Sequence, residues 1–156
     1  RTFNVAGAGA SFMKQFKEVL EAECKLNQCT YEIISMKDPL FENYNNETCS
    51  EIARNAVKKY MGEEALAKAQ PWMACESMQA YLKYWPGVIT FTGIQNPELG
   101  TGANHHTPEF DLDEKGMICG VAAAIGYVVD FLNYEGEIPF TPYEGNIREL
   151  AARNIK

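Results

Sequence analysis

Several residue types and spacings that define common functional sites are scarce or absent in this sequence. Its 156 residues include two histidines, and no H-x-x-x-H, H-E-x-x-H or C-x-x-C spacing occurs. The glycines near residue 100 are not followed by the Lys and helix of a phosphate-binding loop. Because catalytic zinc sites take about three protein ligands, no short segment of this chain forms such a site alone.

Basic residues are also in the minority. The chain has 14 Lys and Arg against 21 Asp and Glu, a formal net charge of −7. Because nucleic-acid surfaces need clustered cations, and no basic stripe occurs, we expect no nucleic-acid partner. The longest apolar run, residues 117–132, contains Asp130 and is shorter than the roughly 20 residues that span a bilayer. We therefore predict a buried helix there and no membrane association.

The cysteines form no disulfide framework by pattern. They are an odd set of five, at positions 24, 29, 49, 75 and 119. This usage suits reduced thiols and a cytoplasmic location. The sequence opens on Arg1 in a strand-like segment, so we expect the chain to be a piece of something longer.

Hydrophobic periodicity predicts alternating strands and helices. Helices are expected at residues 11–26, 47–61, 76–85 and 114–132, with a short one near the C-terminus. Strands are expected at residues 29–36, 70–74 and 88–94, the last being the strongest strand signal. Such alternation predicts an α/β or α+β protein.

Local signals predict where these helices begin and end. Ser11 is the expected N-cap of the first helix, and either Asn45 or Asn46 caps the second. Gly62 ends the second helix. Asp111 and Asp113 are plausible caps for the helix at 114–132.

The two histidines, His105 and His106, are adjacent in the loop TGANHHTPEFDLDE at 101–114. Neighbouring side chains point in different directions, so one of them as a ligand beside a supporting neighbour is easier to build than two ligands to one ion. The alternative is a polar loop whose rings bond to backbone. The residues alone leave both interpretations open.

Other reactive residue types have plainer interpretations. Glu63 and Glu64 follow a helix end and indicate an exposed charged turn. Cys75 has no adjacent cation to lower its thiol pKa, which argues against a nucleophile. Ser77 lacks a G-x-S-x-G context and fits a helix cap better.

Four segments together resemble the C-terminal part of the zinc-dependent amidohydrolases. This is the aminoacylase and carboxypeptidase family, which includes auxin-conjugate and aminobenzoyl-glutamate hydrolases. The closest match is NHHTPEFDLDE, similar to the family's H-H-x-P-x-F-D-x-D-E motif, and it precedes a long helix of small residues. The other segments are RTF at 1–3, YMGEEAL at 60–66 and the stretch at 72–94. The resemblance covers residues 1 to about 133.

The resemblance implies a fold and its boundaries. Residues 1–38 would form the last β-α-β of a ferredoxin-like lid through which copies dimerise into a homo-oligomer. Residues 39–133 would be the C-terminal part of an α/β metallohydrolase catalytic domain. Residues 134–156 would be an extra tail with a short helix.

The resemblance also implies site residues. His106, directly before x-Pro, would be a ligand of a two-metal centre, with zinc the expected divalent metal. His105 would line the site, and Arg1 would reach a substrate carboxylate. Cys75 and Glu76 would border a small amide or peptide-like substrate. No catalytic residue is expected in this chain, because the family's general base and other ligands lie upstream.

The expected function is hydrolysis of N-acyl amino acid or peptide-like amides by metal-activated water, with this chain alone inactive. It departs from the family pattern at Ala74, Cys75, Ser77 and Met78. These departures favour an alternative, a non-catalytic binding or assembly module that keeps the family fold. A third hypothesis is a self-contained small metal-binding protein that uses both histidines and Asp111.

Overall fold

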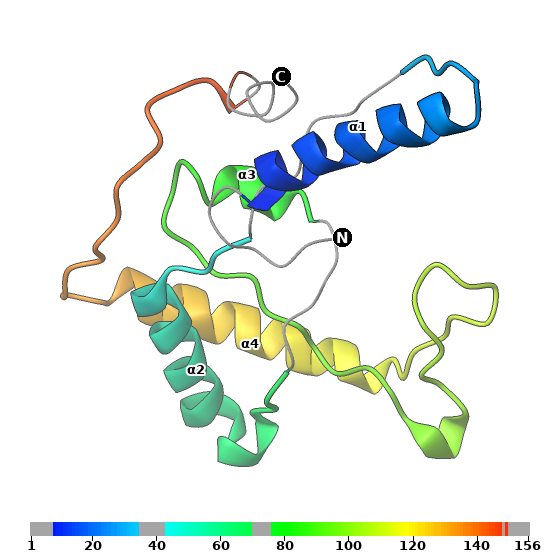
Figure 1. Ribbon diagram of the computed structural model, residues 1–156. Coiled ribbons are helices and arrows are strands. Elements are labelled where there is room, and N and C mark those ends of the chain that lie inside the picture. Colours follow the sequence, from blue (N-terminus) through cyan, green and yellow to red (C-terminus); the bar gives the residue numbers. More distant parts are fainter. Residues whose placement is uncertain (1–7, 35–42, 70–75, 148, 150–156) are drawn as a thin grey trace. The chain divides into compact units, whose positions relative to one another are not determined.

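The computed structural model describes residues 8–34, 43–69, 76–147 and 149 (Figure 1). Two compact units emerge from its contacts. The first is drawn from residues 1–44, 70–85 and 141–156, and the second from residues 45–69 and 86–140. The first boundary lies between residues 44 and 45.

Four α-helices and two short 3₁₀ helices are present among the described residues. They are α1 Ala8–Leu26, α2 Glu47–Met61, η1 Glu63–Ala65, α3 Met78–Tyr81, η2 Pro97–Leu99 and α4 Lys115–Leu132.

Helix α1 begins before the residue predicted to cap it. The N-cap prediction for Ser11 is wrong, because the helix already includes Ala8 and Ser11 lies in its interior. Ala8 and Ala10 favour this earlier start, since alanine is the best helix former, although Gly9 between them opposes it. The Ser11 hydroxyl instead accepts a hydrogen bond from the Gln15 side chain, one turn later, at 3.4 Å.

Helix α2 has the ends that the sequence predicts. Asn46 is its N-cap, and its Oδ1 accepts a hydrogen bond from the Cys49 N–H at 3.0 Å. Gly62 ends the helix at φ 95°, a backbone conformation that strains any residue with a Cβ. The choice left open between Asn45 and Asn46 is thereby decided for Asn46.

The second unit is built on the contact between α2 and α4 (Figure 1). The buried residues of α2 form the core of this unit. They are Cys49, Ile52, Ala53 and Ala56. Across from them, Gly126 is the buried residue of α4. A Cβ added to Gly126 would lie 2.6 Å from the Tyr60 ring, so the glycine lets the aromatic side chain lie against the helix backbone.

The opposite face of α4 is exposed, which corrects the prediction of a buried helix. Only 6% of its 18-residue window is buried, at a mean hydropathy of 1.6. By length and composition alone, it is the one helix in the described part of the chain that could cross a bilayer. Its exposed apolar side chains follow a three-four spacing: Ile118, Val121, Ile125, Val128 and Leu132. Such a stripe normally packs against another surface.

Residues 88–94 do not form the predicted strand. Some of their backbone groups form hydrogen bonds with side chains and loops. The Ile89 N–H donates to Asn45 Oδ1 at 2.9 Å, and the Asn45 Nδ2 donates to the Ile89 C=O at 3.0 Å. Further along, the Ile94 C=O accepts from the Asp113 N–H at 2.9 Å. A strand needs a neighbouring strand, and none is present in the described ranges. The segment at 29–34 also forms no strand, and the strand predicted at 70–74 lies outside the described residues.

Small residues of α4 allow the 88–94 segment to lie directly on the helix. A Cβ at Gly116 would come within 2.9 Å of the Gly93 carbonyl oxygen, and one at Gly120 within 3.1 Å of the Thr92 hydroxyl. The pairing of this segment with α4 therefore depends on glycine at one-turn spacing.

In the first unit, residues 141–147 bond to the turn that follows α3. The Tyr143 N–H donates to the Lys83 C=O at 2.7 Å, and the Tyr84 hydroxyl donates to the Gly145 C=O at 3.1 Å. The rings of Tyr84 and Tyr143 lie 6.4 Å apart. This part of the predicted tail thus has a defined contact within its own unit. Most of the predicted terminal helix lies outside the described residues.

Candidate functional site

The histidine loop is closed at its base by polar side chains. The Asn96 amide donates to Asp113 Oδ2 at 2.7 Å, joining the two stems of the loop. The buried Thr101 hydroxyl accepts from the Asn96 N–H at 2.7 Å, and the Thr101 N–H returns a bond to the Asn96 C=O at 3.2 Å. Asn96, Thr101 and Asp113 therefore form a hydrogen-bonded platform at the base of the loop, next to the start of α4.

Asp113 couples this platform to the helix. Its Oδ1 accepts from the Lys115 N–H at 3.0 Å, so it satisfies a donor in the first turn of α4. The hydrogen bond from Asn96, followed by the one from the Lys115 N–H, lowers the pKa of the Asp113 carboxyl. The N-cap of α4 is Glu114, so the prediction of Asp111 or Asp113 as the cap is wrong, although Asp113 bonds to the first turn from the position before the cap. Asp111 accepts from the adjacent Leu112 N–H at 2.8 Å.

The two histidines lie together at the exposed tip of this loop. Their ring centroids are 4.7 Å apart in an edge-to-face arrangement with 64° between the planes. His106 has φ 65°, in the left-handed region that residues with a Cβ seldom adopt.

The loop alone does not form a metal centre. Among the described residues, no three His, Cys, Asp or Glu side chains are placed to hold a metal ion together. Asp111 is engaged with its own backbone, which weakens the hypothesis of a self-contained site built from both histidines and Asp111. The residues that the structure describes therefore do not make up a complete metal site.

The other predicted site residues are Arg1, Cys75 and Glu76. Arg1 and Cys75 lie outside the described residues. Glu76 lies in the first unit, where its Oε1 accepts from the Ser77 N–H at 2.7 Å and from the Ser77 hydroxyl at 3.1 Å. The histidines lie in the second unit.

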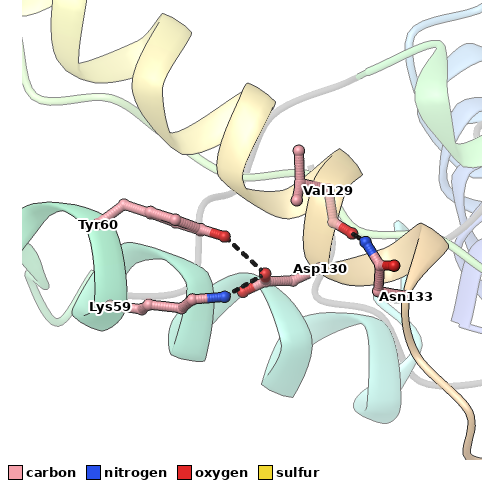
Figure 2. Close-up of polar contacts among 5 residues, drawn as sticks. All are labelled: Lys59, Tyr60, Val129, Asp130 and Asn133. Carbon is pink, nitrogen blue, oxygen red and sulfur yellow. Dashed lines mark hydrogen bonds and ion pairs between the residues drawn. The ribbon is translucent and has the colours of Figure 1, made fainter.

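A polar cluster between α2 and α4 was not predicted from the sequence. Asp130 Oδ1 accepts from Lys59 Nζ and from the Tyr60 hydroxyl, each at 2.8 Å (Figure 2). Next to it lies a cavity of about 180 Å³. Its lining residues are Thr48, Glu51, Ile52, Asn55, Asp130 and Tyr134. Only the apolar spacing of the two helices signalled that these faces would meet.

Comparison with known proteins identifies hydrolases as relatives. The chain is 28% identical over 118 residues to the protein "IAA-amino acid hydrolase ILR1-like 4" of Arabidopsis thaliana, covering 72% of this chain and 27% of the relative. It is 25% identical over 134 residues to "Putative amidohydrolase YhaA" of Bacillus subtilis, covering 80% of this chain and 33% of the relative. A shorter match, 32% over 81 residues, covers 52% of this chain and 10% of a "Putative glutamate--cysteine ligase 2-3" of Rhodococcus jostii.

These relatives confirm the resemblance inferred from the motifs. The chain is similar to the C-terminal portion of the amidohydrolase and aminoacylase family. It spans about a quarter to a third of the length of the amidohydrolase relatives it matches. No family model matches the chain, and no solved structure matches it.

Proposed function

We propose that this chain is the C-terminal part of a metal-dependent amidohydrolase that cleaves N-acyl amino acid or peptide-like amide bonds. The observation that carries the proposal is the similarity to proteins named amidohydrolases over 72 to 80% of this chain. The coarse class, hydrolase, follows from those relatives. Metal dependence, substrate and the inactivity of this chain alone are the proposed part.

In this proposal His106 supplies one ligand to a divalent metal, with zinc the expected ion. Three features support it: the ring is exposed, the backbone is left-handed at that residue, and the loop is braced by Asn96 and Asp113. An exposed imidazole on a braced loop can meet ligands from another part of the protein without a large ordering cost. His105 then lines the site, and Arg1, Cys75 and Glu76 contact the substrate.

The exposed face of α4 supports the same proposal. Ile118 is 71% exposed and Leu132 is 76% exposed, values that suit a face meant to be covered. The 88–94 segment, which has no partner strand among the described residues, points the same way. We propose that a larger α/β domain covers the exposed face of α4 and the 88–94 segment. The α/β class, the lid segment at 1–38 and the catalytic segment at 39–133 remain predictions.

The proposal extends to assembly and location. Helix α1 exposes Phe12, Phe16 and Val19 on one face, and the two Phe rings stack with centroids 6.5 Å apart. This face is the proposed contact between copies in a homo-oligomer. The cysteine usage supports a cytoplasmic location.

A zinc titration tests the ligand assignment. The ring resonances of both histidines are followed by NMR as Zn²⁺ is added to the chain and to His106→Ala and His105→Ala variants. We expect the His106 ring to respond at lower zinc than His105, with affinity no tighter than about micromolar. A complete structural zinc site would bind more tightly, with a binding free energy of roughly 10 to 16 kcal/mol.

Each other outcome contradicts a stated part of the proposal. A first response from His105, or from neither ring, removes His106 as a ligand. Tight one-to-one binding means that the site is complete in this chain. Hydrolysis of N-acetyl amino acids by this chain, unchanged by His106→Ala and by a chelator, would rule out metal dependence. The alternative, a non-catalytic module, predicts no response from either ring.

A further inference from the structure

Helix α1 ends in a Schellman motif whose two key positions are both cysteines. The Cys29 N–H donates to the Cys24 C=O at 2.9 Å, and the Gln28 N–H donates to the Lys25 C=O at 3.4 Å. Gln28 has φ 51°, the left-handed residue that such an ending requires. These are the six-to-one and five-to-two bonds of the motif.

The motif brings together the side chains at its first and last positions. In most proteins these are apolar residues that contact each other across the helix end. Here they are Cys24, which is half-buried, and Cys29, which is exposed. Burial raises the pKa of the Cys24 thiol, and the interaction with Cys29 raises it further.

This geometry suits a disulfide. Bridged cysteines need Cα atoms about 4.4–6.8 Å apart and Cβ vectors that converge. The 2.9 Å hydrogen bond between the two backbones brings the residues close. Side chains at these two positions of a Schellman motif frequently contact each other. The odd cysteine count and the absence of a C-x-x-C pair had favoured reduced thiols over a disulfide framework.

We propose that Cys24 and Cys29 are a redox-reactive dithiol that closes to a disulfide by exchange with a low-molecular-weight disulfide such as oxidised glutathione. The inference stands on the end of α1 and does not depend on the proposed hydrolase function.

The exchange proceeds in two steps. The exposed Cys29, as thiolate, attacks one sulfur of the small disulfide and expels the other as a thiolate, leaving a mixed disulfide on Cys29. Cys24, on losing its proton, then attacks the Cys29 sulfur, and the second small thiolate leaves. Two protein thiols are oxidised, one small disulfide is reduced to two thiols, and the two protons pass to them. The exposure of Cys29 and the partial burial of Cys24 support this order.

The chain offers an internal diagnostic for the bridge. Lys25 lies between the two cysteines, so trypsin separates residues 18–25 from residues 26–37 unless a disulfide joins them. The experiment incubates the folded chain with graded ratios of oxidised to reduced glutathione, traps free thiols with a maleimide and identifies tryptic peptides by mass spectrometry. Cys119, exposed on α4, reports ordinary thiol reactivity in the same sample.

We expect the joined peptides to appear in the wild type while Cys119 carries only mixed disulfide or free thiol. Cys24→Ser should stop at a glutathione adduct on Cys29, and Cys29→Ser should form no bridge. The bridging equilibrium constant should be at least tenfold larger in the folded chain than in urea, because the helix end aligns the thiols. Equal constants in the two states, or a wild type that stops at the adduct as Cys24→Ser does, would overturn the proposal. Circular dichroism checks that each variant keeps its helices.

Discussion

Lys59 on α2 and Asp130 on α4 form an ion pair with 2.8 Å between Nζ and Oδ1 (Figure 2). The same carboxylate oxygen accepts the Tyr60 hydroxyl, so one acidic group connects two successive residues of α2 to α4. The Asp130 side chain is 20% exposed, while that of Lys59 is 59% exposed, so only the acidic partner is shielded from solvent.

The first prediction is that this cluster makes the stability of the second unit depend on pH. The hydrogen bond from Lys59, followed by that from Tyr60, lowers the pKa of Asp130. A lowered pKa means stabilisation that is complete above the carboxyl's ordinary pKa and disappears as the pH falls through the folded-state value. The bond to Asp130 raises the pKa of Lys59, so its share disappears only as the pH rises through that raised value.

Asp130→Asn should therefore lower the thermal midpoint at neutral pH, and the difference from wild type should shrink in acid. Thermal melts followed by circular dichroism between about pH 3 and pH 8 measure this. The matched control is Glu63→Gln, because Glu63 pairs with Lys58 at 2.9 Å but is 81% exposed and should change little. An equal effect of both substitutions would show that Asp130 contributes no more than a surface charge.

A second prediction concerns the close approach of Tyr60 to α4. Gly126→Ala should destabilise the chain by roughly 1 to 3 kcal/mol, since the new methyl group meets the Tyr60 ring at 2.6 Å. The helix propensity of alanine offsets part of this, by about 1 kcal/mol. Urea denaturation measures the free energy of unfolding.

Tyr60→Ala combined with Gly126→Ala provides the control for this contact. If the clash with the ring is the cause, the glycine substitution should cost nothing in the Tyr60→Ala background. A penalty of the same size in both backgrounds would place the strain elsewhere.

The third prediction is that Asn45 and Asn46 do different work although they are adjacent. Asn46→Ala should cost about 1 kcal/mol through loss of the N-cap bond to the Cys49 N–H. Asn45→Asp keeps an acceptor for the Ile89 N–H but loses the donor to the Ile89 C=O. It should therefore free residues near Ile89 while leaving α2 intact.

Amide hydrogen exchange separates these two effects. In Asn45→Asp, faster exchange should be confined to the 88–94 segment, and in Asn46→Ala it should begin at the first turn of α2. Asn45→Ala serves as the control that removes both bonds to Ile89. Uniform acceleration in all three variants would mean that the two asparagines support one structure jointly.

Local rules predicted α1, α2 and α4 well and the strands poorly, for a physical reason. The helix predicted at 76–85 is shorter than expected, since α3 spans only Met78–Tyr81. The bounds of α2 follow from its own caps, and those of α4 nearly so, since Asp113 bonds to the first turn. A strand at 88–94 depends on a partner that periodicity cannot supply, and Asn45 takes its bonds instead. The motif predicted the histidine loop but not its closure by Asn96, because that bond joins residues 17 positions apart.

The last prediction concerns the exposed face of α4, defined by Ile118, Val121, Ile125, Val128 and Leu132. An uncovered apolar stripe at this spacing should make the isolated chain associate with itself as concentration rises. Val121→Glu should weaken that association about tenfold or more, because burying such a side chain contributes roughly 1.5 to 3 kcal/mol and about 1.4 kcal/mol corresponds to a tenfold change. Asn55→Glu adds the same charge on an exposed position of α2 and is the matched control.

Sedimentation velocity over a concentration series measures the dissociation constants. A chain that stays monomeric throughout, or two variants that behave alike, would show that this face drives no self-association.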